Sequence, residues 1–124
     1  MRVSGHLLVV DDAPESLKLM VATLERDGHR VRPADSGELA LAAIAHERPE
    51  LILLDLRMPG FGGLALCDYL KADPILKNIP VVFISGADDV AERLEGLRRG
   101  AVDFIIKPFN GEELLARVHN HIEL

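Results

Sequence analysis

The hydrophobic residues of the chain gather in short runs that are separated by longer mixed segments. Four runs are apolar along nearly their whole length, at residues 7–10, 51–54, 81–84 and 102–106, and a weaker one surrounds Val31. Strands that are apolar throughout, rather than at alternate positions, are typical of parallel sheets covered by helices on both faces. We therefore expect five strands, most of them fully buried.

The mixed segments have the period of amphipathic helices. In the first, apolar residues recur at positions i, i+3, i+4 and i+7 from Leu17 to Leu24. Pro14 lies near the expected start of this helix and Gly28 at its expected end. Four further helices should begin near Ser36, Gly63, Asp88 or Asp89, and Asn110. The chain thus alternates five strands with five helices.

Residue types at the predicted helix ends support these boundaries. Ser36 can cap the second helix, and Pro74 ends the third near Asp73. Asn110 and Glu113 form a capping-box pattern for the fifth. The residues expected to face the core are Leu41 and Ile44 in the second helix, Val90, Leu94 and Leu97 in the fourth, and Leu114, Leu115, Val118 and Ile122 in the fifth. Alternating strands and helices call for right-handed crossovers and an open parallel sheet with helices on both faces, an α/β fold.

Composition narrows the class of protein without naming a function. A length of 124 residues, with 48% hydrophobic and 27% charged residues, suits one globular domain, 1–124. The net charge of -6 disfavours direct binding to nucleic acid. The sequence has no apolar run of the roughly 20 residues that a membrane span needs. The single cysteine, Cys67, is compatible with a reducing cytoplasm, where we expect the protein to be.

Polar residues capable of chemistry come at the ends of the predicted strands. Asp11 and Asp12 follow the first strand, Asp55 ends the third, and Ser85 and Lys107 follow the fourth and fifth. In open parallel sheets, ligands bind at the carboxyl ends of the strands, so these five side chains should converge. A single aspartate after a strand is most often a cap or turn former, but five convergent residues make coincidence improbable.

Three carboxylates in one cavity would repel one another without a cation. Mg²⁺ prefers a few carboxylates together with waters and phosphate oxygens. With the metal bound, ionised Asp55 could attack phosphorus, while Lys107 and the metal neutralise the equatorial oxygens. Ser85 could donate a hydrogen bond to the same oxygens. The residues thus predict phosphoryl transfer to Asp55.

Four segments of the chain resemble the receiver domains of response regulators in two-component signalling. They are Leu8-Val9-Val10-Asp11-Asp12, Leu53-Leu54-Asp55-Leu56-Arg57-Met58-Pro59-Gly60 with Gly63, Ile84-Ser85-Gly86-Ala87, and Gly100-Ala101-Val102-Asp103-Phe104-Ile105-Ile106-Lys107-Pro108-Phe109. The order and spacing of the segments match the family over almost the whole chain. The resemblance implies a flavodoxin-like sheet with strand order 2-1-3-4-5.

The resemblance also implies a role for each site residue. Asp55 would be the phosphoacceptor. Mg²⁺ would be bound by Asp55, directly by Asp12, through water by Asp11, and by the backbone carbonyl of Arg57. Lys107 would pair with the phosphoryl group, with a cis bond to the following Pro108.

A two-state switch is a further implication of the family. Ser85 would move toward the new phosphoryl oxygens and Phe104 would turn inward. The face formed by the fourth helix, fifth strand and fifth helix would report the state to a partner or form a homodimer. The phosphoryl donor would be a sensor histidine kinase or a histidine phosphotransfer protein, because no histidine of this chain has support as a donor. The protein would be a switch with slow self-dephosphorylation rather than an enzyme.

Several features leave alternatives open. The side chain of Arg57 could reach the phosphoryl group, pair with an acid or remain solvated. Phe104 could simply be a core residue. His119 and His121 lie two apart on a helix and should point in different directions, while His29 has no ligand-like spacing. The ending Ile122-Glu123-Leu124 continues the amphipathic pattern, so we expect the chain to be part of a longer regulator or hybrid kinase with an attached output or kinase domain.

Rival functions fit the sequence less well. A flavodoxin-like cofactor carrier would need a phosphate-binding loop where Asp11 and Asp12 stand. A hydrolase of the aspartyl-phosphate type would need a second aspartate at position 57, which is arginine. The Gly-Lys-Ser/Thr signature of a P-loop enzyme is absent from the sequence. A receiver that acts only as a docking module, without phosphorylation, remains the last alternative.

Overall fold

The computed structural model describes residues 5–122, which alternate strands and helices in the predicted order. The strands are β1 (His6–Val10), β2 (Arg30–Ala34), β3 (Leu51–Asp55), β4 (Val81–Gly86) and β5 (Asp103–Lys107). The helices are α1 (Pro14–Arg26), α2 (Gly37–His46), α3 (Gly63–Ala72), α4 (Val90–Arg98) and α5 (Gly111–Ile122). All paired strands are parallel, in the order β2-β1-β3-β4-β5, which confirms the α/β, flavodoxin-like prediction. Ser85 and Lys107 were predicted to follow their strands, but both lie inside them, close to the carboxyl ends of β4 and β5.

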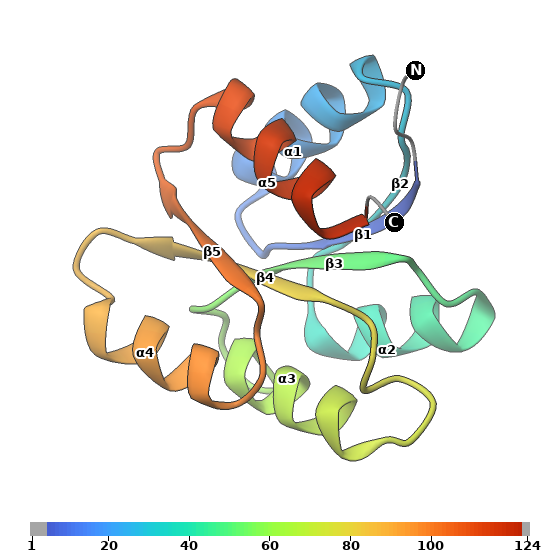
Figure 1. Cartoon of the computed structure of the whole chain (residues 1–124), viewed down its shortest axis with the longest axis vertical. Helices are drawn as coiled ribbons and strands as arrows, with labels where there is room; N and C mark the ends of the chain where they lie inside the picture. Colours follow the sequence, from blue (N-terminus) through green and yellow to red (C-terminus); the bar gives the residue numbers. More distant parts are fainter. Residues whose placement is uncertain (1–4, 123–124) are drawn as a thin grey trace.

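The sheet separates two hydrophobic cores. Helices α1 and α5 cover one face of the sheet, and α2, α3 and α4 cover the other (Figure 1). Because successive strand residues point to opposite faces, Leu8 and Val10 of β1 join the core under α2 and α3, while Leu7 and Val9 join the core under α1 and α5. Burial on both faces explains why the central strands are apolar throughout.

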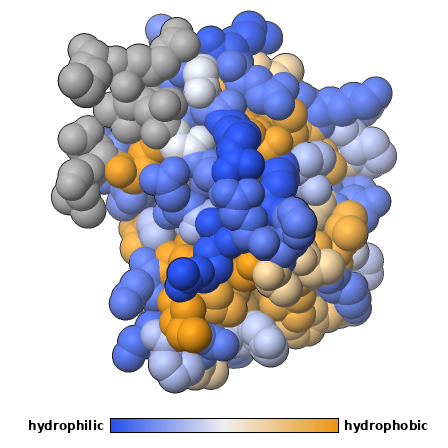
Figure 2. All heavy atoms as spheres, turned by 90° about the vertical axis from the view of Figure 1, so that its right-hand side faces the viewer, coloured by the Kyte–Doolittle hydropathy of each residue, from blue (hydrophilic) through white to orange (hydrophobic). Residues whose placement is uncertain are grey.

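Strand β2 forms one edge of the sheet and is the least apolar of the strands. It carries Arg30, Arg32 and Pro33, and Arg30 pairs with Glu47. Figure 2 views the side of the molecule that includes this edge, and a strongly hydrophilic band crosses it above a region richer in apolar side chains. Charged residues and proline on an edge strand discourage pairing with another chain.

The predicted helix starts are largely confirmed. The Ser36 Oγ accepts a hydrogen bond from the Leu39 N–H at 3.1 Å and caps α2. The Asn110 Oδ1 accepts from the Glu113 N–H at 3.2 Å and caps α5. The Glu113 carboxylate lies 3.4 Å from the Arg117 guanidinium, so only half of the expected capping box forms.

The prediction for the inward face of α4 is wrong. Val90, Leu94 and Leu97 are 54%, 51% and 37% exposed. The buried residue of α4 is instead Gly96, where an added Cβ would lie 2.4 Å from the Phe83 ring. Because glycine lets the helix backbone approach this ring closely, α4 packs through Gly96 and leaves its apolar row outside.

Replacing Gly96 with alanine should therefore destabilise the protein, although alanine favours helices. We expect the free energy of unfolding to fall by about 1–3 kcal/mol because the new methyl group overpacks against Phe83. Gly111→Ala is the matched control, since among residues 5–122 the nearest atom to its Cβ would be the Thr23 Cγ2, in ordinary contact at 3.6 Å. Urea denaturation of both variants checks this, and equal stability of the two would contradict the packing described for α4.

One prediction concerns the last residues of the chain. The expectation that the fifth helix runs on involves Glu123 and Leu124, which lie outside the described residues.

Within residues 5–122, none of the helices combines the length and apolar character that crossing a membrane requires.

Candidate functional site

Three predicted carboxylates meet at the carboxyl edge of the sheet. Asp11 and Asp12 follow β1, and Asp55 is the last residue of β3. One oxygen from each lies within 4.8 Å of the others. Asp11 and Asp55 are only 0% and 5% exposed, whereas Asp12 is open to solvent. The parallel strands thus bring together residues more than 40 positions apart.

Lys107 reaches these carboxylates from the end of β5. Its Nζ lies 3.1 Å from the Asp11 Oδ2 and 3.4 Å from the Asp55 Oδ2. Burial alone would lower the pKa of Lys107, but the hydrogen bond to Asp11 and the charges of both aspartates raise it. The ammonium is therefore charged at neutral pH. The bond from Lys107 to Pro108 is cis, as expected.

The two buried carboxylates compete for ionisation. Burial, together with a hydrogen bond and the charge of Asp11, raises the pKa of Asp55 to about 6. Burial opposes ionisation of Asp11 as well, but hydrogen bonds from the Ala13 N–H and from Asp55 lower its pKa. Below about pH 6 Asp55 therefore holds a proton, and a cation bound beside the two carboxylates would favour its release.

The site has the donor set and the space that a hard divalent ion requires. Its oxygens come from carboxylates, one of them open to solvent, which suits an ion that keeps several waters. A cavity of about 470 Å³ adjoins them and is lined by Asp12, Ala13, Asp55, Arg57, Gly86, Ala87, Asp88, Asp89 and Lys107. The residues present therefore fit Mg²⁺, and they leave room for a phosphoryl group beside it.

Ser85 and Phe104, the two residues predicted to take part in a switch, lie on the neighbouring strands β4 and β5. Ser85 is 1% exposed near the end of β4, and within residues 5–122 its Oγ has no hydrogen-bond partner. A buried hydroxyl without a partner is costly unless another group supplies one. Phe104 of β5 is half-buried against the core, and the Arg93 guanidinium lies 5.1 Å from the centre of its ring.

Arg57 connects the end of β3 to α4. Its backbone N–H donates to the Asp55 Oδ1 at 3.1 Å. Its guanidinium contacts the Asp89 Oδ1 and the Glu92 Oε2, each at 2.6 Å. Of the alternatives left open for this side chain, pairing with acids is the one observed.

The role of Asp89 was missed by sequence reasoning. Asp89 precedes α4 at the predicted cap position, but its side chain makes no capping bond. It is only 4% exposed, and its Oδ2 accepts from the Gly86 N–H at 2.9 Å. Its partner Arg57 lies 32 residues away, so no local pattern indicates the contact.

Replacing Arg57 with alanine should destabilise the protein more than an ordinary surface change does. Buried Asp89 would lose its ionic partner, at a cost of about 1–2 kcal/mol in the free energy of unfolding. Arg30→Ala is a matched control, because the Arg57 and Arg30 side chains are 63% and 62% exposed but Arg30 pairs with an exposed glutamate. That control should cost less than about 1 kcal/mol. Equal losses in urea denaturation would contradict the role given to Asp89.

Comparison with known proteins identifies this arrangement. The sequence model of one protein family, the response regulator receiver domain, matches residues 7–119. The chain belongs to this family. The matched part of the receiver domain contains Asp11, Asp12, Asp55, Ser85 and Lys107.

Individual relatives support the same assignment. The receiver domain is 42% identical over 118 residues to the response regulator PleD of Caulobacter vibrioides, covering 95% of this chain and 26% of PleD. It is 38% identical over 113 residues to the DNA-binding response regulator MtrA of Mycolicibacterium smegmatis, covering 91% of this chain and 48% of MtrA. A crystal structure of a response regulator from Chloroflexus aurantiacus J-10-fl superposes with a TM-score of 0.93 at 32% identity, covering 98% of this chain and 100% of that one. The chain thus spans about a quarter of the length of PleD and about half of the length of MtrA.

Proposed function

We propose that this receiver domain accepts a phosphoryl group from a phosphohistidine donor onto Asp55 in a Mg²⁺-dependent reaction. The observation that carries the proposal is the placement of Lys107 within 3.4 Å of both buried aspartates, at the edge where the acceptor is open to the cavity. This arrangement supplies a nucleophile, a fixed cation and space for the donor.

The proposed transfer forms a bond from an Asp55 oxygen to phosphorus and breaks the bond from phosphorus to the donor's imidazole nitrogen. The electron pair of the broken bond returns to that imidazole. The Arg57 N–H orients the Asp55 carboxylate, and Lys107 offsets negative charge on the transferring group. Ser85, which has a hydroxyl to offer, would donate to the same phosphoryl oxygens.

Mg²⁺, when bound, would neutralise charge on both the acceptor and the phosphoryl oxygens. Asp12 would bind it directly and Asp11 through water, together with Asp55 and the carbonyl of Arg57. The exposure of Asp12 and the burial of Asp11 support this division of roles. The pKa of Asp55, raised to about 6, gives the ion a further effect, since it would hold the acceptor ionised.

We propose that phosphorylation acts as a conformational switch rather than as a step of an enzyme's turnover. Ser85 would shift toward the phosphoryl group and Phe104 would turn inward, leaving its contact with Arg93. The face of α4, β5 and α5 would then contact an output domain, a partner or a second copy. The exposed Val90, Leu94 and Leu97 of α4 support this choice of face, because they leave an apolar row on it.

The proposed partners follow from this role. A sensor histidine kinase or a histidine phosphotransfer protein would supply the phosphoryl group. The greater length of PleD and MtrA supports a covalently linked output or kinase domain, with 1–124 as the receiver part. The net charge of -6 favours signalling without direct nucleic-acid contact by this domain, and we place the protein in the cytoplasm.

Trapping the phosphorylated residue tests the proposal. After reaction with acetyl phosphate and Mg²⁺, borohydride should reduce the acyl phosphate of Asp55 to homoserine, with release of phosphate. Peptide mass mapping should then find homoserine at position 55. Homoserine at another aspartate, or none in protein that has taken up phosphate, would overturn the assignment of Asp55.

A further inference from the structure

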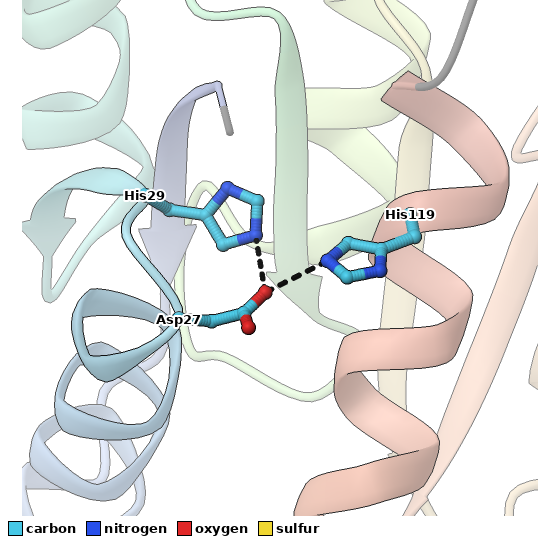
Figure 3. A group of neighbouring side chains, drawn as sticks. All are labelled: Asp27, His29 and His119. Carbon is cyan, nitrogen blue, oxygen red and sulfur yellow. Dashed lines mark hydrogen bonds and ion pairs between the residues drawn. The ribbon is translucent and has the colours of Figure 1, made fainter. Parts of the chain in front are cut away.

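A second group of side chains of the kinds that bind metal ions lies between α1 and α5. Asp27 follows α1, His29 precedes β2, and His119 lies on α5. Their side chains converge on one point (Figure 3), where the Asp27 Oδ2 lies 3.3 Å from the His29 Nε2 and 2.7 Å from the His119 Nε2. Sequence spacing gave no sign of this group because His29 and His119 are 90 residues apart.

We propose that Asp27, His29 and His119 form a Zn²⁺ site that ties the end of α1 to α5. One ligand atom from each residue lies within 4.8 Å of the others. Two imidazoles and a carboxylate suit zinc and similar borderline metals better than Mg²⁺, which prefers oxygen. Three protein ligands leave the fourth position to water, and half-buried Asp27 and His119 give solvent access to it.

The buried member of the group is already oriented. His29 is 4% exposed, and its Nδ1 accepts a hydrogen bond from the Gly5 N–H at 3.1 Å. This bond holds the ring with its Nε2 directed at Asp27 and His119, as Figure 3 shows. A metal ion would thus meet one fixed ligand and two that need small movements.

Metal binding must rearrange protons in a defined way. Because the Gly5 N–H uses the Nδ1 lone pair, the neutral His29 ring carries its proton on Nε2, facing Asp27. Zn²⁺ would take the Nε2 lone pair, so the ring proton would move to Nδ1 and the Gly5 hydrogen bond would be lost. His119 would likewise yield its Nε2 to the metal. Because the hydrogen bond from the Gly5 N–H is lost, the affinity for Zn²⁺ should be lower than that of a site that needs no rearrangement. The same loss changes the surroundings of the Gly5 amide, so this amide can report metal binding.

The test is a titration of untagged protein with Zn²⁺ against a chromophoric chelator. Asp12→Asn serves as the common background, so that the acidic site at Asp55 competes less for zinc. We expect one equivalent to bind, with His119→Ala weakening binding by at least about tenfold. His121→Ala is the matched control, because His121 is also on α5 and also pairs with a carboxylate, that of Asp103 at 3.1 Å. It should leave the affinity unchanged.

Two further readouts separate metal binding from a purely structural contact. The amide resonance of Gly5 should shift with the same midpoint as the titration, and Zn²⁺ should raise the melting temperature of the background protein but not of the His119→Ala variant. Failure to bind Zn²⁺, equal weakening by His121→Ala, or binding that leaves the Gly5 resonance in place would each overturn the proposal. Asp27 would then serve only to pair with His29 and His119.

Discussion

Replacing Lys107 with methionine should slow the uptake of a phosphoryl group from acetyl phosphate by about a hundredfold. The ammonium lies 3.1 Å and 3.4 Å from the two buried aspartates, where charge on the transferring group must be offset. Methionine fills a similar volume without charge, so the change removes the electrostatic contribution and largely keeps the packing. Quenched-flow sampling with separation of the phosphorylated form measures the rate.

A lysine far from the site provides the control for this variant. Lys18 is exposed on α1, and Lys18→Met makes the same change in net charge. It should leave the rate with a small phosphodonor nearly unchanged. Equal rates for the two variants would mean that the long-range charge, and not the position of Lys107, accounts for any effect.

Replacing Asp55 with asparagine should stabilise the folded protein at neutral pH in the absence of divalent ions. Burial and the neighbouring Asp11 raise the pKa of Asp55 to about 6, so ionisation above that pH costs folding free energy. The amide carries no charge and can donate to Asp11. We expect a gain of roughly 1–3 kcal/mol in the free energy of unfolding at pH 8.

The pH dependence of this gain has a definite sign. In the folded state Asp55 binds its proton more tightly than in the unfolded chain, where the pKa is near 4. The contribution of Asp55 to the stability of the native protein should therefore fall as pH rises from about 4 through 6, and the gain from asparagine should vanish below about pH 4. Urea denaturation from pH 4 to 8 with EDTA measures this. A gain that stays constant with pH would contradict the raised pKa.

Much of the fold and of the acidic site follows from the sequence because both depend on short-range patterns. Fully apolar runs mark strands buried on both faces, and the carboxyl ends of parallel strands must share one edge. The sequence alone therefore predicts that Asp55 and Lys107 lie in one site. The strand order, in contrast, was implied by the resemblance to receiver domains, and the observed order β2-β1-β3-β4-β5 confirms it.

The failures have a common physical origin in contacts between distant segments. The spacing of Val90, Leu94 and Leu97 predicts that this side of α4 faces the core. Close packing of Gly96 on Phe83 instead decides which side of the helix faces inward. The pairing of Arg57 with buried Asp89 depends on how two strand-end loops approach each other. No local period or spacing in the sequence predicts the contact of Gly96 with Phe83 or that of Arg57 with Asp89.

Intact-mass analysis after incubation with acetyl phosphate, with and without Mg²⁺, tests the central claim most directly. The native receiver domain should gain the mass of one phosphoryl group only when Mg²⁺ is present, and Asp55→Asn should gain none under the same conditions. A folded native protein that stays unmodified with Mg²⁺, or an Asp55→Asn variant that gains the same mass, would contradict phosphorylation of Asp55.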